Sequence, residues 1–254
     1  MELFSLQDKV AVVVGGSKGL GRGIATGLAL AGATVVLGSR HQRELDQTAA
    51  EIRKETRAAV YGVAVDMTSL AGIEDFVRQV IAKAGHIDIL VNSAGINIRK
   101  SALDFTEQDW DTVQDVQLKY VFFMNQAVAR HMIQAKIPGR LINMASLTSV
   151  LGLKGMVAYG AAKAGIVQMT KALANEWAEY GLRVNAIGPG YYKTEMTQAL
   201  FADEKAVKAM LANIPLRRLG LPEDLIGTAI LLASDAAAYI TGQVFYVDGG
   251  WLIE

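Results

Sequence analysis

The fold class follows from the stretch Val10-Ala-Val-Val-Val-Gly15-Gly-Ser-Lys-Gly19-Leu-Gly21. Its first five residues are apolar and mostly β-branched, which predicts a strand buried on both faces of a parallel sheet. The glycines that follow open a helix that extends to about residue 32. Such a turn lets a phosphate approach bare backbone N–H groups at the positive end of the helix dipole. The stretch therefore predicts a phosphate site after the first strand; the alternative is a tight connection with no ligand.

The rest of the chain repeats this alternation of buried strands and amphipathic helices. It predicts the α/β class, as a single-domain, Rossmann-type, doubly wound parallel sheet of about seven strands with helices on both faces. One domain is expected to cover residues 1–254, with its ligands across the carboxyl ends of the strands. Further strands are expected at 34–37, 59–65, 87–91, 140–144, 183–187 and 243–247, and helices at 42–55, 70–84, 107–135 and 155–180.

Composition limits the possible functions. The chain has 254 residues, 52% of them hydrophobic, and no polar linker divides it. Its 25 basic and 25 acidic residues cancel, which argues against nucleic acid or an anionic membrane as a partner. The absence of cysteine excludes thiol chemistry and suits a reducing compartment. Without a basic leader or an apolar run of membrane length, we expect a cytoplasmic protein.

Ser39 and Arg40 follow the second strand and indicate the cofactor. An acidic residue at this place holds the ribose diol of NAD, whereas a serine does not repel a 2′-phosphate and an arginine binds it through two hydrogen bonds. Lys18 adds a second positive charge from the glycine turn. These residues favour NADP(H) over NAD(H), unless both cations are solvated surface charges. Asp66, which ends the third strand, is expected to meet the adenine amino group by analogy with this fold.

Tyr159 and Lys163 indicate acid–base chemistry, with Ser146 before them. In a helix, their four-residue spacing places the phenol and the ammonium on one face about one turn apart. A neighbouring cation favours the phenolate and lowers the pKa of the phenol. The Ser146 hydroxyl would then hold a carbonyl oxygen while Tyr159 protonates it. Because a surface helix with an extended lysine gives the same pattern, the pair is informative only in context.

In this context the chain resembles the short-chain dehydrogenase/reductase family from end to end. The glycine turn, Asn92-Ser-Ala-Gly95, Ser146, the Tyr159–Lys163 pair and Pro189-Gly190 follow the order of that family. The resemblance implies hydride transfer between NADP(H) and a carbonyl or alcohol carbon, with Lys163 lowering the pKa of Tyr159 and binding the nicotinamide ribose. The expected catalytic residues are Ser146, Tyr159, Lys163 and Gln117. The expected cofactor contacts are Gly15, Ser17, Lys18, Gly19, Leu20, Gly21, Ser39, Arg40, Asp66, Met67, Asn92, Ala94, Gly95, Tyr159, Lys163, Pro189, Gly190, Tyr192 and Thr194.

Gln117 departs from the family pattern. The family usually has an asparagine here, whose backbone carbonyl anchors a water that links the lysine to solvent. Glutamine preserves this role if a local helix bulge survives. If it does not, the proton relay is affected and the hydride step is not. Val14 and Ser93 replace the usual threonine and asparagine, and both alter local hydrogen bonds between the first and fourth strands.

The features that indicate a substrate are less specific than the catalytic motifs. Arg99 and the ending Asp248-Gly-Gly-Trp251 resemble sugar-acid and polyol members of the family, such as gluconate 5-dehydrogenase and 2-deoxy-gluconate 3-dehydrogenase. Arg99 suits a substrate carboxylate, unless it is a solvated loop charge. The expected substrate contacts are Ser146, Tyr159 and Arg99.

Three other functions stay open. A 3-oxoacyl-thioester reductase would need a basic patch for an acidic carrier, for which Arg130, His131 and Lys136 are a thin candidate. A broad ketone or carbonyl reductase is the second alternative, and a non-catalytic nucleotide-binding protein is the remote one. The first would be distinguished by turnover of a thioester, and the last by cofactor binding without turnover.

The sequence also leads to expectations about metal binding, a substrate lid and the oligomeric state. His41, His86 and His131 share no ligand spacing, so no metal site is predicted. Residues 191–214 are predicted to form a substrate lid. Apolar residues on more than one side of the two long helices predict a subunit interface, and the resemblance implies a homotetramer or homodimer.

Overall fold

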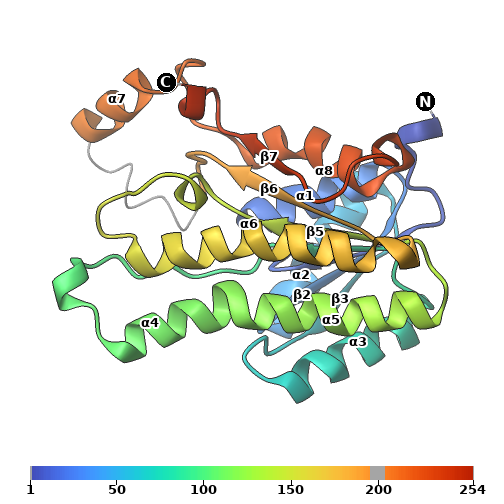
Figure 1. Ribbon diagram of the computed structural model, residues 1–254. Helices are drawn as coiled ribbons and strands as arrows, with labels where there is room; N and C mark the ends of the chain where they lie inside the picture. The colour runs from blue at the N-terminus through green and yellow to red at the C-terminus, as the bar shows by residue number, and fades with distance from the viewer. Residues whose placement is uncertain (1, 195–203, 254) are drawn as a thin grey trace.

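The computed structural model describes residues 2–194 and 204–253 and is drawn in Figure 1. Its seven parallel strands form one sheet in the order β3-β2-β1-β4-β5-β6-β7. The chain reverses direction along the sheet between β1 and β4, which is the switch point of a doubly wound fold. The predicted class and strand number are confirmed. The strands are β1 Val10–Val14, β2 Thr34–Ser39, β3 Val60–Ala64, β4 Ile89–Asn92, β5 Arg140–Met144, β6 Arg183–Pro189 and β7 Val244–Val247.

Helices cover both faces of the sheet. Successive strand residues alternate between two cores, as Val12 and Val13 do on β1, so the strands are apolar throughout. One core lies under α1 (Gly19–Leu30), α2 (Gln42–Thr56) and α8 (Ile226–Ala233). The other lies under α3 (Leu70–Ala84), α5 (Tyr120–Gln134) and α6 (Val157–Trp177), and Figure 1 shows these three helices together at the front of the molecule.

The long helix predicted at 107–135 is interrupted. α4 (Glu107–Gln114) begins with a capping box in which Thr106 and Asp109 exchange hydrogen bonds. A π-helical turn, Asp115–Lys119, then separates α4 from α5. A π turn accommodates an extra residue and is frequent at functional sites. Apolar spacing alone did not reveal the interruption, because the helix direction continues across it.

The predicted lid at 191–214 is described only in part. Tyr192 forms an isolated bridge with Gly220, and α7 spans Glu204–Ala212. Residues 195–203 lie outside the described part of the chain, so the lid stays a prediction. Within residues 2–194 and 204–253, no helix is long and apolar enough to cross a membrane.

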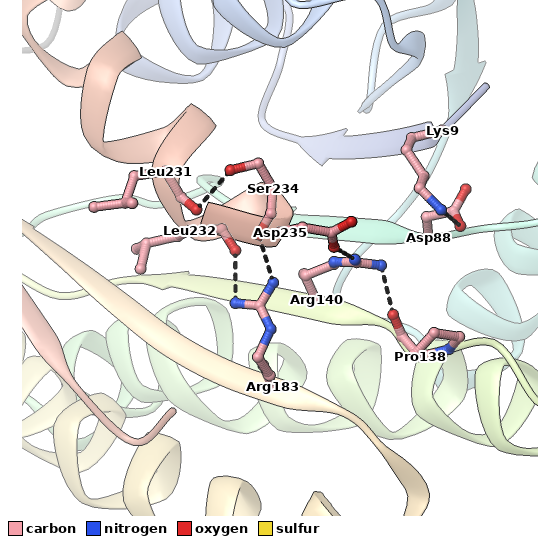
Figure 2. A network of polar contacts seen from close by, with 9 residues as sticks. All are labelled: Lys9, Asp88, Pro138, Arg140, Arg183, Leu231, Leu232, Ser234 and Asp235. Carbon is pink, nitrogen blue, oxygen red and sulfur yellow. Dashed lines mark hydrogen bonds and ion pairs between the residues drawn. The ribbon is translucent and has the colours of Figure 1, made fainter. Parts of the chain in front are cut away.

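A network of arginines lies at the amino ends of β5 and β6 (Figure 2). Arg140, which begins β5, pairs with the carboxylate of Asp235. Arg183, which begins β6, donates to the carbonyls of Leu232 at 3.1 Å and Ser234 at 2.8 Å. A cation at this place also meets the negative end of the α8 dipole. The network holds the end of α8 against the amino ends of β5 and β6. The predicted site is at the opposite, carboxyl ends of the strands.

Candidate active site

The glycine turn packs directly against the segment that follows β4. Gly15 has φ +81°, and a Cβ there would lie 2.5 Å from the backbone nitrogen of Ala94. Only glycine tolerates both the conformation and this contact. Two predicted parts of the site, far apart in sequence, therefore touch at the carboxyl edge of the sheet.

The first turn of α1 is the expected position of a bound phosphate. Its N-cap residue, Lys18, makes no side-chain capping hydrogen bond. Thr194, which follows β6, lies over this turn, since a Cβ on Gly19 would be 3.8 Å from the Thr194 side chain. Uncapped N–H groups at a helix start suit a phosphate, and Thr194 closes one side of that space.

The ends of β2 and β3 lie side by side and carry opposite charges. Asp66 accepts hydrogen bonds from the Thr68 amide at 2.9 Å and hydroxyl at 2.7 Å. These bonds, with the nearby charge of Arg40, hold the pKa of Asp66 below its usual range. The Ser39 hydroxyl is buried and has no hydrogen-bond partner among the described residues. The Met67 side chain lies in the core, so only its backbone is left for a ligand.

Ser146, Tyr159 and Lys163 converge as predicted. β5 ends at Met144, and Ser146 opens the short 3-10 turn that follows. Tyr159 and Lys163 lie on the first turns of α6. Lys163 donates from Nζ to the Met144 carbonyl at 2.7 Å. Ser146 lies within hydrogen-bonding reach of the Tyr159 phenol. The two hydroxyl groups are therefore close together just beyond the carboxyl end of β5.

Burial controls the protonation of this group. It raises the pKa of Tyr159, an effect that the Ser146 hydrogen bond and the charge of Arg99 only partly offset. It also lowers the pKa of Lys163 to about 7. The expectation that Lys163 lowers the Tyr159 pKa stays a prediction. Desolvation is the largest influence on the phenol, and Lys163, with a pKa of about 7, carries a positive charge only part of the time at neutral pH.

Gln117 lies in the π turn and is 1% exposed. Its Nε2 donates to the carbonyl of Ile96. A Cβ on Gly95 would lie 2.7 Å from the same nitrogen, so Gln117 packs tightly onto the segment after β4. Its Oε1 is buried without a partner among the described residues. The helix bulge on which the predicted relay depends is therefore present with glutamine.

A buried polar network that sequence reasoning missed joins four elements under the site. Asn143 accepts at Oδ1 from Asn92 at 3.0 Å and from Asn125 at 2.9 Å, and donates to Thr170 Oγ1 at 3.1 Å. All four side chains are buried. The network fixes α6, which carries the phenol and the ammonium, against β4 and β5. Asn92 belongs to a segment that the sequence indicated, but Asn125 and Thr170 form no motif with it, so the sequence did not indicate the network.

Arg99 and Lys100 have different environments. Lys100 pairs with Asp109 at 2.5 Å, and this pair with Thr106 lowers the pKa of Asp109 to about 2. Arg99 is exposed and makes no ion pair or hydrogen bond within the described ranges. Its charge acts on the phenols of both Tyr159 and Tyr191. Arg99 is therefore the cation that faces the candidate site.

The two tyrosines that follow β6 have different environments. Gly190 donates its backbone N–H to the Val247 carbonyl at 3.0 Å, next to Pro189 at the strand end. The Tyr192 side chain points into the core, where its hydroxyl donates to the same carbonyl at 2.9 Å. Tyr191 faces outward instead and packs against Trp251. The predicted cofactor contact of Tyr192 is thus left to its backbone and stays a prediction, while the charge of Arg99 acts on the phenol of Tyr191.

The basic residues proposed for an acidic carrier lie elsewhere. Arg130 and His131 are in the last turns of α5, and Lys136 follows shortly before β5 begins at Arg140. They are at the amino edge of the sheet, opposite Tyr159. In the described residues, no group of three or more His, Asp or Glu side chains could hold a metal ion.

Known proteins match this chain over its whole length. A sequence model of the family described as Enoyl-(Acyl carrier protein) reductase matches residues 14–252. The chain belongs to the short-chain dehydrogenase/reductase family. Within this family it is 43% identical to a 2-dehydro-3-deoxy-D-gluconate 5-dehydrogenase of Escherichia coli, over 99% of this chain and 98% of that protein. It is 39% identical to a gluconate 5-dehydrogenase of Gluconobacter oxydans, over 98% and 96%.

A solved short-chain dehydrogenase/reductase has the same architecture. The gluconate 5-dehydrogenase of Burkholderia cenocepacia, in complex with NADP and tartrate, superposes with a TM-score of 0.95 at 35% identity, over 100% of this chain and 98% of that one. Membership of this family makes the protein an oxidoreductase that acts on a CH–OH group or the corresponding carbonyl.

Proposed function

We propose that the protein is an NADP(H)-dependent oxidoreductase that interconverts a keto sugar acid and its secondary alcohol, in the manner of a gluconate 5-dehydrogenase. The observation that carries the proposal is the position of Arg99. It is an exposed guanidinium, without a partner among the described residues, whose charge reaches the phenol of Tyr159. A substrate with a carboxylate would pair with Arg99 and bring its carbonyl to Tyr159.

The residues at the carboxyl edge fit NADP(H). The uncapped start of α1 would hold the diphosphate, and Lys18 and Arg40 would neutralise a 2′-phosphate on the ribose. The buried, unpartnered hydroxyl of Ser39 would find a hydrogen-bond partner in the same group. When bound, NADP(H) supplies or accepts the hydride. The Burkholderia relative carries NADP in its complex.

Ser146, Tyr159 and Lys163 would perform the proton chemistry. Ser146 would hold the carbonyl oxygen, and Tyr159 would donate the proton to it in reduction or accept it in oxidation. Because burial keeps the phenol protonated at neutral pH, Tyr159 is prepared for reduction. Lys163, held by the Met144 carbonyl, would orient a ribose hydroxyl and exchange protons with solvent. Gln117 would support that exchange from the π turn.

The relatives support a sugar acid as the substrate. Two are named for gluconate or its 2-dehydro-3-deoxy derivative, and the Burkholderia structure holds tartrate, an organic acid. A 3-oxoacyl-thioester reductase is the second candidate, favoured by the description of the matching family model. Its expected basic patch lies at the opposite edge from Tyr159, which makes it the weaker candidate.

The oligomeric state and the cellular location are also proposed. We propose a homotetramer or homodimer, supported by exposed apolar residues such as Val157 on α6 and Trp110 on α4. The absence of cysteine supports a cytoplasmic location. Light scattering coupled to gel filtration would measure the assembly, and a monomeric mass would contradict it.

The test is the loss of NADPH absorbance with 5-keto-D-gluconate. NADH and an acetoacetyl thioester are run alongside under the same conditions, and Tyr159→Phe serves as the control for the site. Turnover of the keto acid with NADPH that disappears in Tyr159→Phe supports the proposal. Turnover only of the thioester overturns the substrate, and preference for NADH overturns the cofactor. Cofactor binding without turnover of any substrate indicates a non-catalytic protein.

A further inference from the structure

The C-terminal segment folds back against the candidate site. Asp248, just after β7, accepts hydrogen bonds from the backbone of Gly250 and Leu252, both at 2.9 Å. These two bonds fix the short 3-10 turn Trp251–Ile253. The Gly249 carbonyl also accepts from the Leu216 amide at 3.1 Å, which ties the turn to the chain that follows α7. Figure 1 shows the C-terminus beside α7. The turn is therefore held in one place.

This turn presents Trp251 to Tyr191. The two ring centres are 4.8 Å apart, with the ring planes inclined by 57°. Both side chains are only partly buried, so the pair keeps an open side. Tyr191 is two residues beyond Pro189, which ends β6, and this places the pair at the carboxyl edge of the sheet. An ordered pair of large aromatic rings beside a site offers a rigid, mostly apolar surface.

Tyr191 shares its surroundings with the proton donor. Arg99 follows β4, Tyr159 lies on α6 after β5, and Tyr191 follows β6, so all three lie towards the carboxyl edge of the sheet. The charge of Arg99 acts on both phenols. Burial raises the pKa of Tyr191, which keeps its hydroxyl protonated as a neutral hydrogen-bond donor. This edge thus carries a cation, a proton donor and an aromatic surface, while Lys100, the neighbour of Arg99 in the chain, is already paired with Asp109.

We infer that Tyr191 and Trp251 form an aromatic wall that binds the carbon chain of the sugar acid between its carboxylate at Arg99 and its carbonyl at Tyr159. The inference rests on the proposed function and extends it to the residues that select the substrate. The C–H groups of a polyhydroxylated chain carry a small positive charge, which matches the negative face of an aromatic ring. The Tyr191 hydroxyl would bind one of the chain hydroxyls.

The experiment compares Trp251→Leu, Trp251→Phe and the unchanged enzyme with 5-keto-D-gluconate and NADPH. Tyr239→Leu is the matched control, since Tyr239 is a fully exposed aromatic residue between α8 and β7, towards the amino edge. We expect Trp251→Leu to raise KM for the keto acid about five- to tenfold, with KM for NADPH, kcat and Tm nearly unchanged. Trp251→Phe should keep most of the affinity, and Tyr239→Leu should change none of these values.

A second measurement does not depend on turnover. Indole fluorescence is followed while 5-keto-D-gluconate is added to enzyme saturated with NADP⁺, a pair that cannot react because both members are oxidised. The change seen in the unchanged enzyme should be lost in Trp251→Phe, although Trp110 and Trp177 remain.

Each outcome decides the inference. An unchanged KM in Trp251→Leu overturns it, and so does an equal loss of keto-acid affinity, NADPH affinity and Tm, because that pattern indicates a structural role only. Absence of keto-acid turnover by the unchanged enzyme overturns the proposed function, and the inference with it. If the unchanged enzyme turns over the keto acid and Trp251→Leu has the same KM, the aromatic wall is overturned and the proposed function stands.

Discussion

The ammonium nitrogen of Lys163 lies 5.5 Å from the centre of the Tyr159 ring. Both groups leave the same face of α6, and the ammonium is directed to the Met144 carbonyl at 2.7 Å. The lysine is thus anchored to the end of β5, and the phenol stands free to meet a substrate oxygen beside Ser146. Burial of both groups sets their charge states in opposite directions, and this determines how the enzyme should respond to pH.

The first prediction concerns the direction of the reaction. Because burial raises the pKa of Tyr159, the phenol is protonated throughout the neutral range. Reduction, which needs the proton, should have a kcat/KM that is nearly constant between about pH 6 and 8, whereas oxidation, which needs the phenolate, should become faster as pH rises. Initial rates in both directions across this range check it. An oxidation rate that falls with rising pH would contradict the assignment.

Lys163 should reduce the stability of the folded chain at neutral and acid pH. Its pKa is about 7 when folded, against 10.5 as the ordinary value, so the unfolded state binds more protons between these two values. Stability should therefore rise with pH through this window. Lys163→Met removes the cost and should stabilise the protein at pH 6 by up to roughly 5 kcal/mol, less the lost hydrogen bond to Met144.

Urea unfolding of the two proteins at pH 6 and pH 10 measures this effect. The difference should shrink at pH 10, because the lysine is already neutral in the folded chain and the unfolded chain, with a pKa near 10.5, gains little by keeping its proton. An advantage of Lys163→Met that is equal at both pH values would mean that the buried lysine keeps its ordinary pKa.

Gln117 should act through the carbonyl of Ile96. Gln117→Leu fills a similar volume but leaves that buried carbonyl without its donor, which should cost about 1–3 kcal/mol of unfolding free energy. The segment that contains Ile96 also adjoins the site. If the substitution displaces this segment, kcat should fall while KM for NADPH changes little. Gln117→Asn, with a shorter amide, should recover part of both losses. Equal kcat values in all three proteins would remove Gln117 from the catalytic machinery.

The arginine network at the opposite edge should affect stability alone. Asp235→Asn removes the charge that faces Arg140 and should lower the unfolding free energy by about 1 kcal/mol, because the Arg140 side chain is 8% exposed but that of Asp235 is 70% exposed. Since the network is at the amino ends of the strands, kcat/KM should be unchanged at a temperature where the variant is folded. Urea unfolding and initial rates measure the two effects. A lower kcat/KM of Asp235→Asn with an unchanged unfolding free energy would show that the network acts on the site and not on stability.

The sequence predicted the sheet well because its strands are buried on both faces. Continuous apolar runs such as Val10–Val14 leave few alternatives, and the predicted order of strands and helices is confirmed. The π turn around Gln117 did not appear in the pattern, because one inserted residue barely shifts the apolar spacing over a long helix. Ends of strands also moved by one or two residues, as where β6 continues to Pro189.

The site was predictable where the residues follow one another in a motif. Ser146, Tyr159 and Lys163 come together as expected, whereas the choice between neighbours required the fold. Tyr191 and Tyr192 are adjacent, yet one faces Trp251 and the other lies in the core. The Asn143 network and the sign of the Tyr159 pKa shift depend on packing between distant segments, which spacing does not reveal.

The most direct test of the account is the pair Arg99→Met and Lys100→Met, measured with NADPH. The substrates are 5-keto-D-gluconate and D-fructose, a neutral ketose of the same chain length. We expect Arg99→Met to lower kcat/KM for the keto acid by about tenfold to a hundredfold and to leave the low rate with fructose unchanged, since a charge-assisted pair to the carboxylate is lost. Lys100→Met, whose partner is Asp109, should leave both ratios near those of the unchanged enzyme. Equal rates with the keto acid in Arg99→Met and the unchanged enzyme would contradict the claim that this site is built for a sugar acid.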